Sequence, residues 1–310
     1  MHDRSLPAPG RRAFLQRAAA GASAALVPVF TRAQSAPLTR NVPKTGEALP
    51  AVGLGSWITF NVGSDPVARS ACADVMRAFV DAGGRMIDSS PMYGSSQDVI
   101  GDGLRRAGLT QRVFAADKVW TSSGAQGRAQ IEQSRRKWQV ARFDLVQVHN
   151  LLAWRDHLPT LYAMKAAGEI RYVGITTSEG RRHRDVEDLL RREPLDFVQV
   201  SYNPADREVE ERILPLARDR GVAVIVNRPF RERALLQSLA GQRLPAWAAD
   251  IGCATWAQVV LKFIVAHPAV TCVIPATTRV DHVRENLAAA REPLPDAALR
   301  QRIAAAVERA

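Results

Sequence analysis

Short apolar runs rich in β-branched residues recur along the chain, and most are followed by a longer stretch with helical spacing. The runs predict eight strands, at residues 51–57, 85–88, 113–116, 145–149, 172–175, 197–201, 222–226 and 271–274. Between them, apolar residues recur with a period of about 3.6, as at Cys72, Val75, Met76 and Phe79. Strands that are apolar on both faces and alternate with helices indicate a buried parallel sheet. Eight such repeats predict the α/β class, as a (β/α)8 TIM barrel.

Two segments extend this repeat. Residues 42–49 have a turn signal at Thr45-Gly46 and predict an N-terminal β-hairpin that closes the bottom of the barrel. Residues 297–310 predict an extra C-terminal helix packed outside. Since no linker-like composition interrupts residues 34–310, we expect them to form a single domain.

The first 33 residues have a different character. Arg11-Arg12 is followed by Phe14-Leu15, then by a weakly apolar Ala-rich stretch and by Thr31-Arg32-Ala33. This order of charged, apolar and small residues is typical of a cleavable signal peptide, and the arginine pair resembles a twin-arginine (Tat) export signal. The resemblance implies the Tat translocon as a partner and a periplasmic or otherwise exported protein, folded with its cofactor before export. An uncut anchor or an amphipathic helix is the alternative.

Composition narrows the functional classes. The net charge is +11, and residues 1–33 carry five Arg against one Asp. The remaining basic excess is spread along the chain, so we expect no nucleic-acid partner. No run of 18 apolar residues is present, so we expect no stable insertion in a membrane. The three cysteines lack metal-ligand spacing, and we expect no metal site.

Polar residues gather where the predicted strands end, which is the active-site end of such barrels. Asp88 ends the second strand with Tyr93 just behind it, Lys118 follows the third, and His149 ends the fourth. A free phenol is a weak acid, and a neighbouring ammonium held by a carboxylate favours its ionised form. A histidine beside it can orient a carbonyl oxygen. The set predicts proton donation to a carbonyl, although Asp88 and Lys118 alone could be a structural ion pair.

Four segments carry a family resemblance that covers about residues 40–290. They are residues 84–96 (GRMIDSSPMYGSS), 116–120 (ADKVW), 144–149 (DLVQVH) and 165–175 (KAAGEIRYVGI). Together they resemble the aldo/keto reductase family. The resemblance implies that Asp88, Tyr93, Lys118 and His149 form the catalytic tetrad. It also implies a nicotinamide cofactor across the barrel mouth, usually NADPH.

The same resemblance assigns cofactor-binding positions. Thr277 and Arg279 match the segment that meets the 2′-phosphate, and Ala276 and His282 depart from the family pattern there. Asn227 is a third departure, since it stands where an aromatic residue often stacks on the nicotinamide. These departures weaken the match, and the resemblance still favours NADPH over NADH. The implied cofactor-binding residues are Gly55, Ser56, Thr176, Thr177, Gln199, Asn227, Arg228, Thr277, Arg279, Glu285 and Asn286. Thr176 could instead cap a helix, and Gly55 could serve only close packing.

Three tryptophans just past strand ends, Trp57, Trp120 and Trp154, are candidates for a substrate pocket or for plain packing. We expect a monomer acting on a small-molecule carbonyl or alcohol. The favoured function is NAD(P)H-dependent interconversion of an aldehyde or ketone and its alcohol, with a tyrosine as general acid. An exported nucleotide-binding sensor or accessory subunit with little turnover is the alternative. An aldolase using Lys118 as a Schiff base would leave Tyr93 without a purpose.

Overall fold

Eight parallel strands surround the centre of the molecule in a computed structural model that describes residues 1–2 and 37–310. The sheet runs in strict chain order from β3 to β10, and parallel bridges at Val52–Val273 and Gly55–Ala276 join its two edges. A Cβ on Gly55 would lie 2.8 Å from the Ile274 carbonyl oxygen, so glycine is needed where the barrel closes. The strands are β3 Leu54–Gly55, β4 Met86–Asp88, β5 Phe114–Val119, β6 Phe143–His149, β7 Ile170–Thr176, β8 Phe197–Ser201, β9 Ala223–Asn227 and β10 Val270–Val273.

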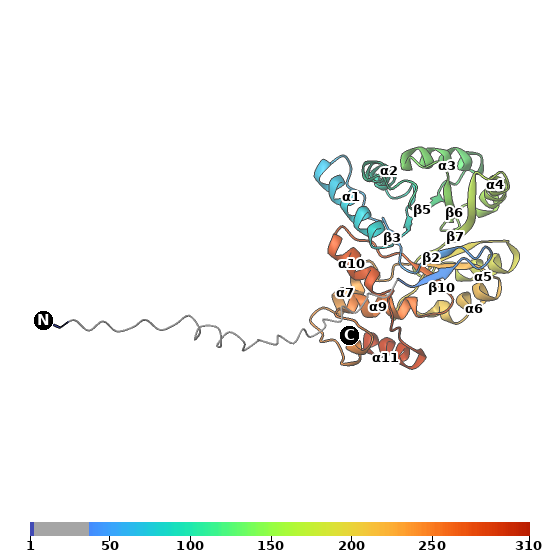
Figure 1. Ribbon diagram of the computed structural model, residues 1–310. Helices are drawn as coiled ribbons and strands as arrows, with labels where there is room; N and C mark the ends of the chain where they lie inside the picture. Colours follow the sequence, from blue (N-terminus) through green and yellow to red (C-terminus); the bar gives the residue numbers. More distant parts are fainter. Residues whose placement is uncertain (3–36) are drawn as a thin grey trace. The chain divides into compact units, whose positions relative to one another are not determined.

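Helices surround this sheet (Figure 1). The first begins where Asp65 accepts hydrogen bonds from the Val67 and Ala68 amides, with Pro66 in the first turn. The face predicted from Cys72, Val75, Met76 and Phe79 is buried. The helices are α1 Pro66–Asp81, α2 Ser96–Ala107, α3 Gly124–Trp138, α4 Trp154–Ala166, α5 His183–Arg192, α6 Ile213–Asp219, α7 Ala234–Ser238, α8 Trp247–Asp250, α9 Trp256–Val265, α10 Val280–Ala288 and α11 Ala297–Glu308, with a 3₁₀ turn at Glu208–Glu210.

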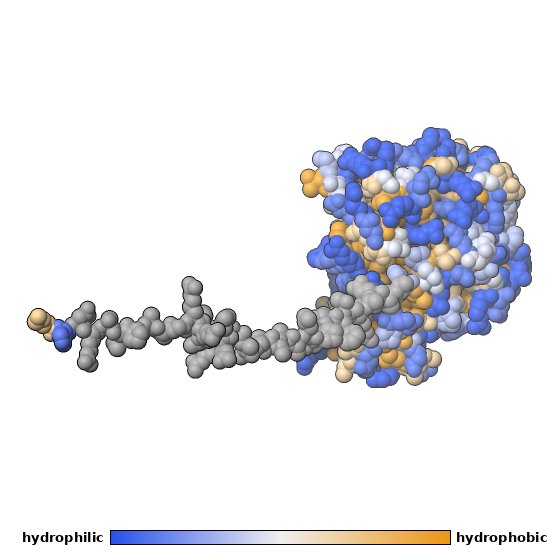
Figure 2. Space-filling view, viewed as in Figure 1, coloured by the Kyte–Doolittle hydropathy of each residue, from blue (hydrophilic) through white to orange (hydrophobic). Residues whose placement is uncertain are grey.

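The outward faces of these helices are polar. On the face seen in Figure 2, the surface is largely hydrophilic, with smaller hydrophobic areas between the hydrophilic ones. This is the pattern expected of helices that bury one face against a sheet. None of the described helices is long and apolar enough to cross a bilayer.

A separate apolar core fills the inside of the barrel. Phe114, Tyr172 and Phe197 contact one another there, with ring centroids 5.3–6.1 Å apart. Val42 and Leu49 join the same cluster from the predicted hairpin, whose strands are β1 Thr39–Asn41 and β2 Ala48–Pro50. The hairpin therefore closes the end of the barrel where the strands begin, as predicted.

The fold prediction is confirmed, with differences at element boundaries. Residues 51–57 were expected to form one strand, but only Leu54–Gly55 form a regular ladder, and the chain turns at Ile58 with φ +63°. Strand β5 continues to Val119, so Lys118 lies inside the strand rather than beyond it. Helices α7 and α8 were not predicted, because with five and four residues they are too short to show a helical spacing of apolar residues. The predicted signal segment falls almost wholly outside the described residues.

Candidate active site

The four residues of the predicted tetrad come together at the carboxyl ends of three neighbouring strands. Asp88 is the last residue of β4, His149 is the last of β6, and Lys118 lies on β5 between them. Tyr93 lies in the loop between β4 and α2, where its amide donates to the Ser90 carbonyl oxygen at 3.0 Å. The carboxyl ends of parallel strands meet at one rim of a barrel, so distant parts of the sequence converge here.

The loop that carries Tyr93 is held by a glycine and an asparagine. Gly94 has φ +59°, and a Cβ there would lie 2.3 Å from the Asn61 side-chain oxygen. The same oxygen accepts the Ser95 amide at 3.0 Å. Another residue at position 94 would therefore push the Tyr93 loop away from Asn61.

Asp88 and Lys118 form a buried ion pair, and both side chains make further hydrogen bonds. Lys118 Nζ lies 2.5 Å from Asp88 Oδ2 and donates to the Ser89 carbonyl oxygen at 2.8 Å. Asp88 Oδ1 accepts from the side-chain amides of Gln147 and Gln199, at 3.1 and 3.0 Å. Burial is the largest single influence on Lys118 and disfavours the ammonium, but Asp88 together with Tyr93 and Asp117 outweighs it, so the pKa of Lys118 is raised. The lysine is therefore a fixed cation beneath the tyrosine.

Tyr93 lies directly beside that cation. Lys118 Nζ is 5.2 Å from the centroid of the Tyr93 ring. Burial raises the pKa of Tyr93 more than Lys118 lowers it. The lysine acts in the expected direction, but the expected net lowering of the pKa is not seen in this structure. The phenol therefore keeps its proton at neutral pH, as a proton donor must.

His149 is held neutral on the other side of the tyrosine. The two rings meet edge to face with centroids 5.7 Å apart. Burial, together with the Lys118 charge, lowers the pKa of His149 to about 3. A neutral imidazole offers one N–H donor, which suits it to orient a carbonyl oxygen.

A polar network extends from Asp88 along the strand ends to several predicted cofactor residues. Gln199 Oε1 accepts from Thr176 Oγ1 and from Asn227 Nδ2, both at 3.3 Å. Asn227 also donates to the Thr177 carbonyl oxygen at 2.9 Å. Helix α5 begins at His183 with Arg182 as its cap, so Thr176 does not cap it. Thr176, Thr177, Gln199 and Asn227 are thus brought together.

The other predicted cofactor residues form separate groups. Ser56 is fully buried and donates to the Asp88 carbonyl oxygen at 2.9 Å, which supports the catalytic strand end. Arg228 pairs with Glu179 at 2.9 Å and with Glu232 at 2.8 Å. In this structure Gly55 therefore serves close packing, Ser56 supports the backbone of Asp88, and Arg228 is held in ion pairs.

The segment predicted to bind the 2′-phosphate of the cofactor lies at the start of α10. Thr277 Oγ1 accepts the Arg279 amide at 3.1 Å, and the exposed Arg279 side chain pairs with Asp281 at 3.0 Å. The first turn of α10 has no side-chain cap. Glu285 accepts from Thr255 and Asn286 is buried on the same helix. A helix start without a side-chain cap, with a guanidinium beside it, favours an anion.

The tryptophans separate into two sets. The Trp57 ring lies 4.8 Å from the Tyr93 ring, and the Trp120 ring lies 6.5 Å from His149. These two remain 39% and 40% exposed, so they border the opening above the tetrad. Trp154 stacks with Arg155 and lines another hollow of about 410 Å³.

Two supporting residues were missed by the sequence reasoning. Gln147 lies two residues before His149 on the same strand face, and its polarity inside an apolar strand was an available signal. Ser90 contacts His149, a link between loop and strand that no local pattern reports. Among residues 1–2 and 37–310, no group of three or more His, Cys, Asp or Glu side chains is placed to hold a metal.

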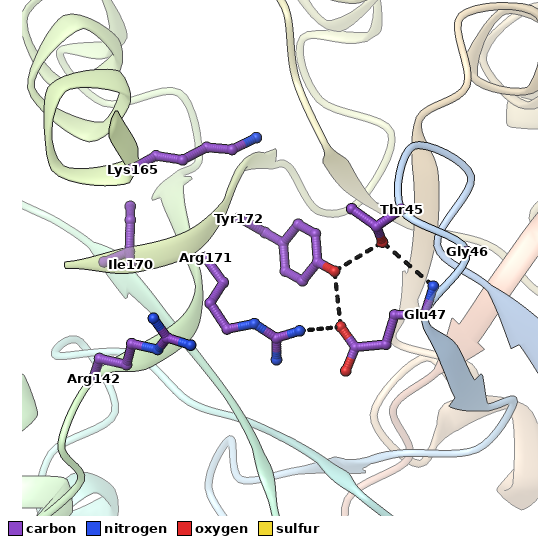
Figure 3. A pocket seen from close by; sticks show the side chains of 8 residues that line it. All are labelled: Thr45, Gly46, Glu47, Arg142, Lys165, Ile170, Arg171 and Tyr172. Carbon is purple, nitrogen blue, oxygen red and sulfur yellow. Dashed lines mark hydrogen bonds and ion pairs between the residues drawn. The ribbon is translucent and has the colours of Figure 1, made fainter. Parts of the chain in front are cut away.

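A larger hollow of about 740 Å³ lies at the opposite end of the barrel, beside the hairpin (Figure 3). There the Glu47 carboxylate accepts from Arg171 at 2.5 Å and from the Tyr172 hydroxyl at 2.8 Å. Thr45 bonds the same hydroxyl at 2.9 Å. Because these polar groups satisfy one another, their arrangement ties the hairpin to β7.

Comparisons with known proteins agree with this geometry. Residues 51–306 match the model of the aldo/keto reductase family. The methylglyoxal reductase YeaE of Escherichia coli is 27% identical over 261 residues, covering 81% of this chain and 89% of that protein. An aldo/keto reductase of Klebsiella pneumoniae, solved with NADP and acetate, aligns with a TM-score of 0.71 and 26% identity over 85% of this chain and 92% of that one. A second aldo-keto reductase from Klebsiella pneumoniae, solved with NADPH, has a TM-score of 0.73 and 24% identity over 88% and 96% of the two chains. The chain described here therefore belongs to the aldo/keto reductase family of oxidoreductases.

Proposed function

We propose that the protein reduces an aldehyde or ketone to its alcohol with NADPH, using Tyr93 as the general acid. The observation that carries this proposal is the stack of three groups at the barrel rim. Asp88 holds Lys118 at 2.5 Å, and Lys118 lies 5.2 Å from the centre of the Tyr93 ring. A protein that only binds a nucleotide has no need of a phenol over a buried ammonium.

The proton comes from Tyr93. The phenol is protonated before reaction, since burial raises its pKa. As negative charge grows on the carbonyl oxygen, the phenol gives up its proton and the fixed Lys118 cation stabilises the forming phenolate. Because Asp88 and its amide donors hold the cation in place, little reorganisation is needed at that moment.

His149 orients the substrate. Its neutral ring lies at the edge of Tyr93, so one carbonyl oxygen can accept from both side chains. Trp57 and Trp120 border this point and offer apolar, partly exposed surfaces. We propose that they contact the body of the carbonyl compound, and that Trp154 contributes only to a large substrate.

The described residues fit a nicotinamide dinucleotide. When bound, NADPH supplies the hydride that no side chain can donate. Thr176 and Asn227 would hold its carboxamide, aligned by Gln199, and Arg228 would contact its pyrophosphate. At α10, Thr277, Arg279 and the uncapped helix start would hold the 2′-phosphate. Thr177 would border the nicotinamide, while Glu285 and Asn286 would hold the adenine.

The direct test is reduction of 4-nitrobenzaldehyde by NADPH deuterated at C4. We expect the alcohol product to carry deuterium on its carbinol carbon. Tight binding of NADPH without its oxidation, over a broad carbonyl panel, would contradict the proposal and favour the nucleotide-binding sensor. Borohydride trapping of a carbonyl compound on Lys118 would favour an aldolase instead.

We also propose that the chain is exported through the twin-arginine route. The support is the sequence Arg11-Arg12-Ala-Phe-Leu-Gln16 with the small residues Thr31 and Ala33 before Gln34. Export by that route is compatible with an enzyme that binds its nucleotide before it leaves the cytoplasm. Replacing both Arg11 and Arg12 with lysine should leave the protein in the cytoplasm, which fractionation measures. Unchanged export would contradict the proposal.

A further inference from the structure

The loop between β4 and α2 places a serine hydroxyl against the histidine of the site. Ser90 Oγ lies 2.8 Å from His149 Nδ1, and both residues are buried, with 0% and 6% of their surfaces exposed. The Ser90 carbonyl oxygen also accepts the Tyr93 amide. One residue therefore contacts His149 through its side chain and supports the Tyr93 loop through its backbone.

The direction of the serine–histidine bond follows from the other bond that Ser90 makes. The Met92 amide donates to Ser90 Oγ at 3.2 Å, so this oxygen already acts as an acceptor. If His149 Nδ1 carried a proton, Ser90 would accept a second bond and its own hydroxyl proton would lack an acceptor among the described residues. Leaving a buried donor unpaired is unfavourable. The satisfied arrangement has Ser90 donating to an unprotonated Nδ1.

We propose that Ser90 is a positioning residue that fixes His149 as the tautomer with its proton on Nε2. A neutral imidazole has one proton, so a bond that keeps it off Nδ1 places it on Nε2. Nε2 makes no hydrogen bond to any residue of the described chain, so it is free to donate to a substrate oxygen. This inference rests on the proposed carbonyl reduction for its purpose, but the tautomer itself can be observed without turnover.

The first test is a long-range proton–nitrogen NMR spectrum of the wild-type protein at neutral pH. The chain has six histidines, and the signals of His149 are assigned by their loss in His149→Gln. We expect the coupling pattern of a ring with a protonated Nε2 and a bare Nδ1. A protonated Nδ1 in the wild-type protein would overturn the proposal, and this readout does not require any variant at position 90 to fold.

The second test compares variants. Ser90→Ala should give His149 a mixture of tautomers and lower kcat about tenfold, the effect of losing one orienting hydrogen bond, with KM for NADPH unchanged. Ser90→Thr keeps the hydroxyl and should restore both the tautomer and most of kcat. Ser134→Ala removes another buried hydroxyl, which accepts from Gln97 on the outer side of the sheet, and should change neither.

Two outcomes separate this inference from the proposed function. A wild-type protein with a protonated Nε2 but no turnover of any carbonyl would sink the reductase proposal and leave the tautomer assignment standing. Ser90→Ala with the wild-type tautomer and the wild-type kcat would sink the role of Ser90 and leave the reductase proposal standing.

Discussion

Replacing Lys118 with methionine removes the cation from the buried pair and leaves the Asp88 carboxylate inside the protein. The side chains of Lys118 and Asp88 are 0% and 2% exposed, so water cannot solvate the charge that remains. Breaking a buried ion pair by deleting one partner costs about 3–5 kcal/mol. Gln147 and Gln199 still donate to Asp88 Oδ1, which favours the lower end of that range.

Removing both charges should cost much less. In the double variant Lys118→Met/Asp88→Asn, the asparagine oxygen can still accept from Gln147 and Gln199, and no charge is buried. We expect its free energy of unfolding to lie within about 2 kcal/mol of wild type, since neutral replacement of a buried pair is often tolerated. Neither variant should reduce carbonyls, because Lys118 is needed beside Tyr93.

The assay is a double-mutant cycle with wild type, Lys118→Met, Asp88→Asn and the double variant, using guanidinium unfolding followed by circular dichroism. In thermal unfolding of the same proteins, the single Lys118→Met change should lower Tm by roughly 6–10 °C, at about 2 °C per kcal/mol for a domain of this size. The two single effects should sum to more than the double effect. Strict additivity would refute the reasoning, since it would mean that the two charges do not stabilise each other.

Three further predictions concern titration and cofactor choice. Burial raises the pKa of Asp117 to about 7, so its ionisation destabilises the folded state as pH rises from about 4 through 7. Asp117→Asn should therefore stabilise the protein on the order of 2 kcal/mol more at pH 8 than at pH 5, as measured by guanidinium unfolding, and an equal gain at both would contradict the burial argument. His149, with a pKa of about 3 when folded and about 6.5 when unfolded, has the opposite effect, and stability is lost as pH falls below 6.5. Its contribution to that loss is about 2 kcal/mol at pH 5, so in His149→Gln the free energy of unfolding should fall less steeply as pH decreases below 6.5. The same pH dependence as wild type would contradict a buried neutral ring. Asp281→Asn should release Arg279 and lower KM for NADPH by about two- to fivefold, as expected for an exposed ion pair, leaving KM for NADH unchanged. A matching change for both cofactors in steady-state kinetics would place Arg279 away from the 2′-phosphate.

Much of the fold was predictable because the same pattern, an apolar strand followed by a helix with one apolar face, repeats along the chain. The barrel strands are buried along almost their whole length, so their apolar runs stand out, and α1 carries a clear apolar face through Val75 and Phe79. The boundaries were less predictable. Lys118 is polar but belongs to β5, because the Asp88 carboxylate replaces the water that its ammonium would otherwise need.

The site was predictable where chemistry falls at strand ends and unpredictable where contacts cross between elements. Asp88 and His149 end their strands, so topology alone brings them to one rim. The contact between Ser90 and His149 joins residues 59 positions apart, and sequence spacing cannot report it. The balance of burial and charge on Tyr93 likewise depends on how deeply the ring sits.

The most direct measurement of the central claim compares Tyr93→Phe with wild type in NADPH-dependent reduction of 4-nitrobenzaldehyde. The change removes one hydroxyl from a ring that keeps its contacts with Trp57 and Lys118. If Tyr93 donates the proton, kcat should fall by about 10²–10⁴ while the Kd of NADPH stays the same. Equal turnover by the two proteins would contradict the account, because the proton would then come from another group.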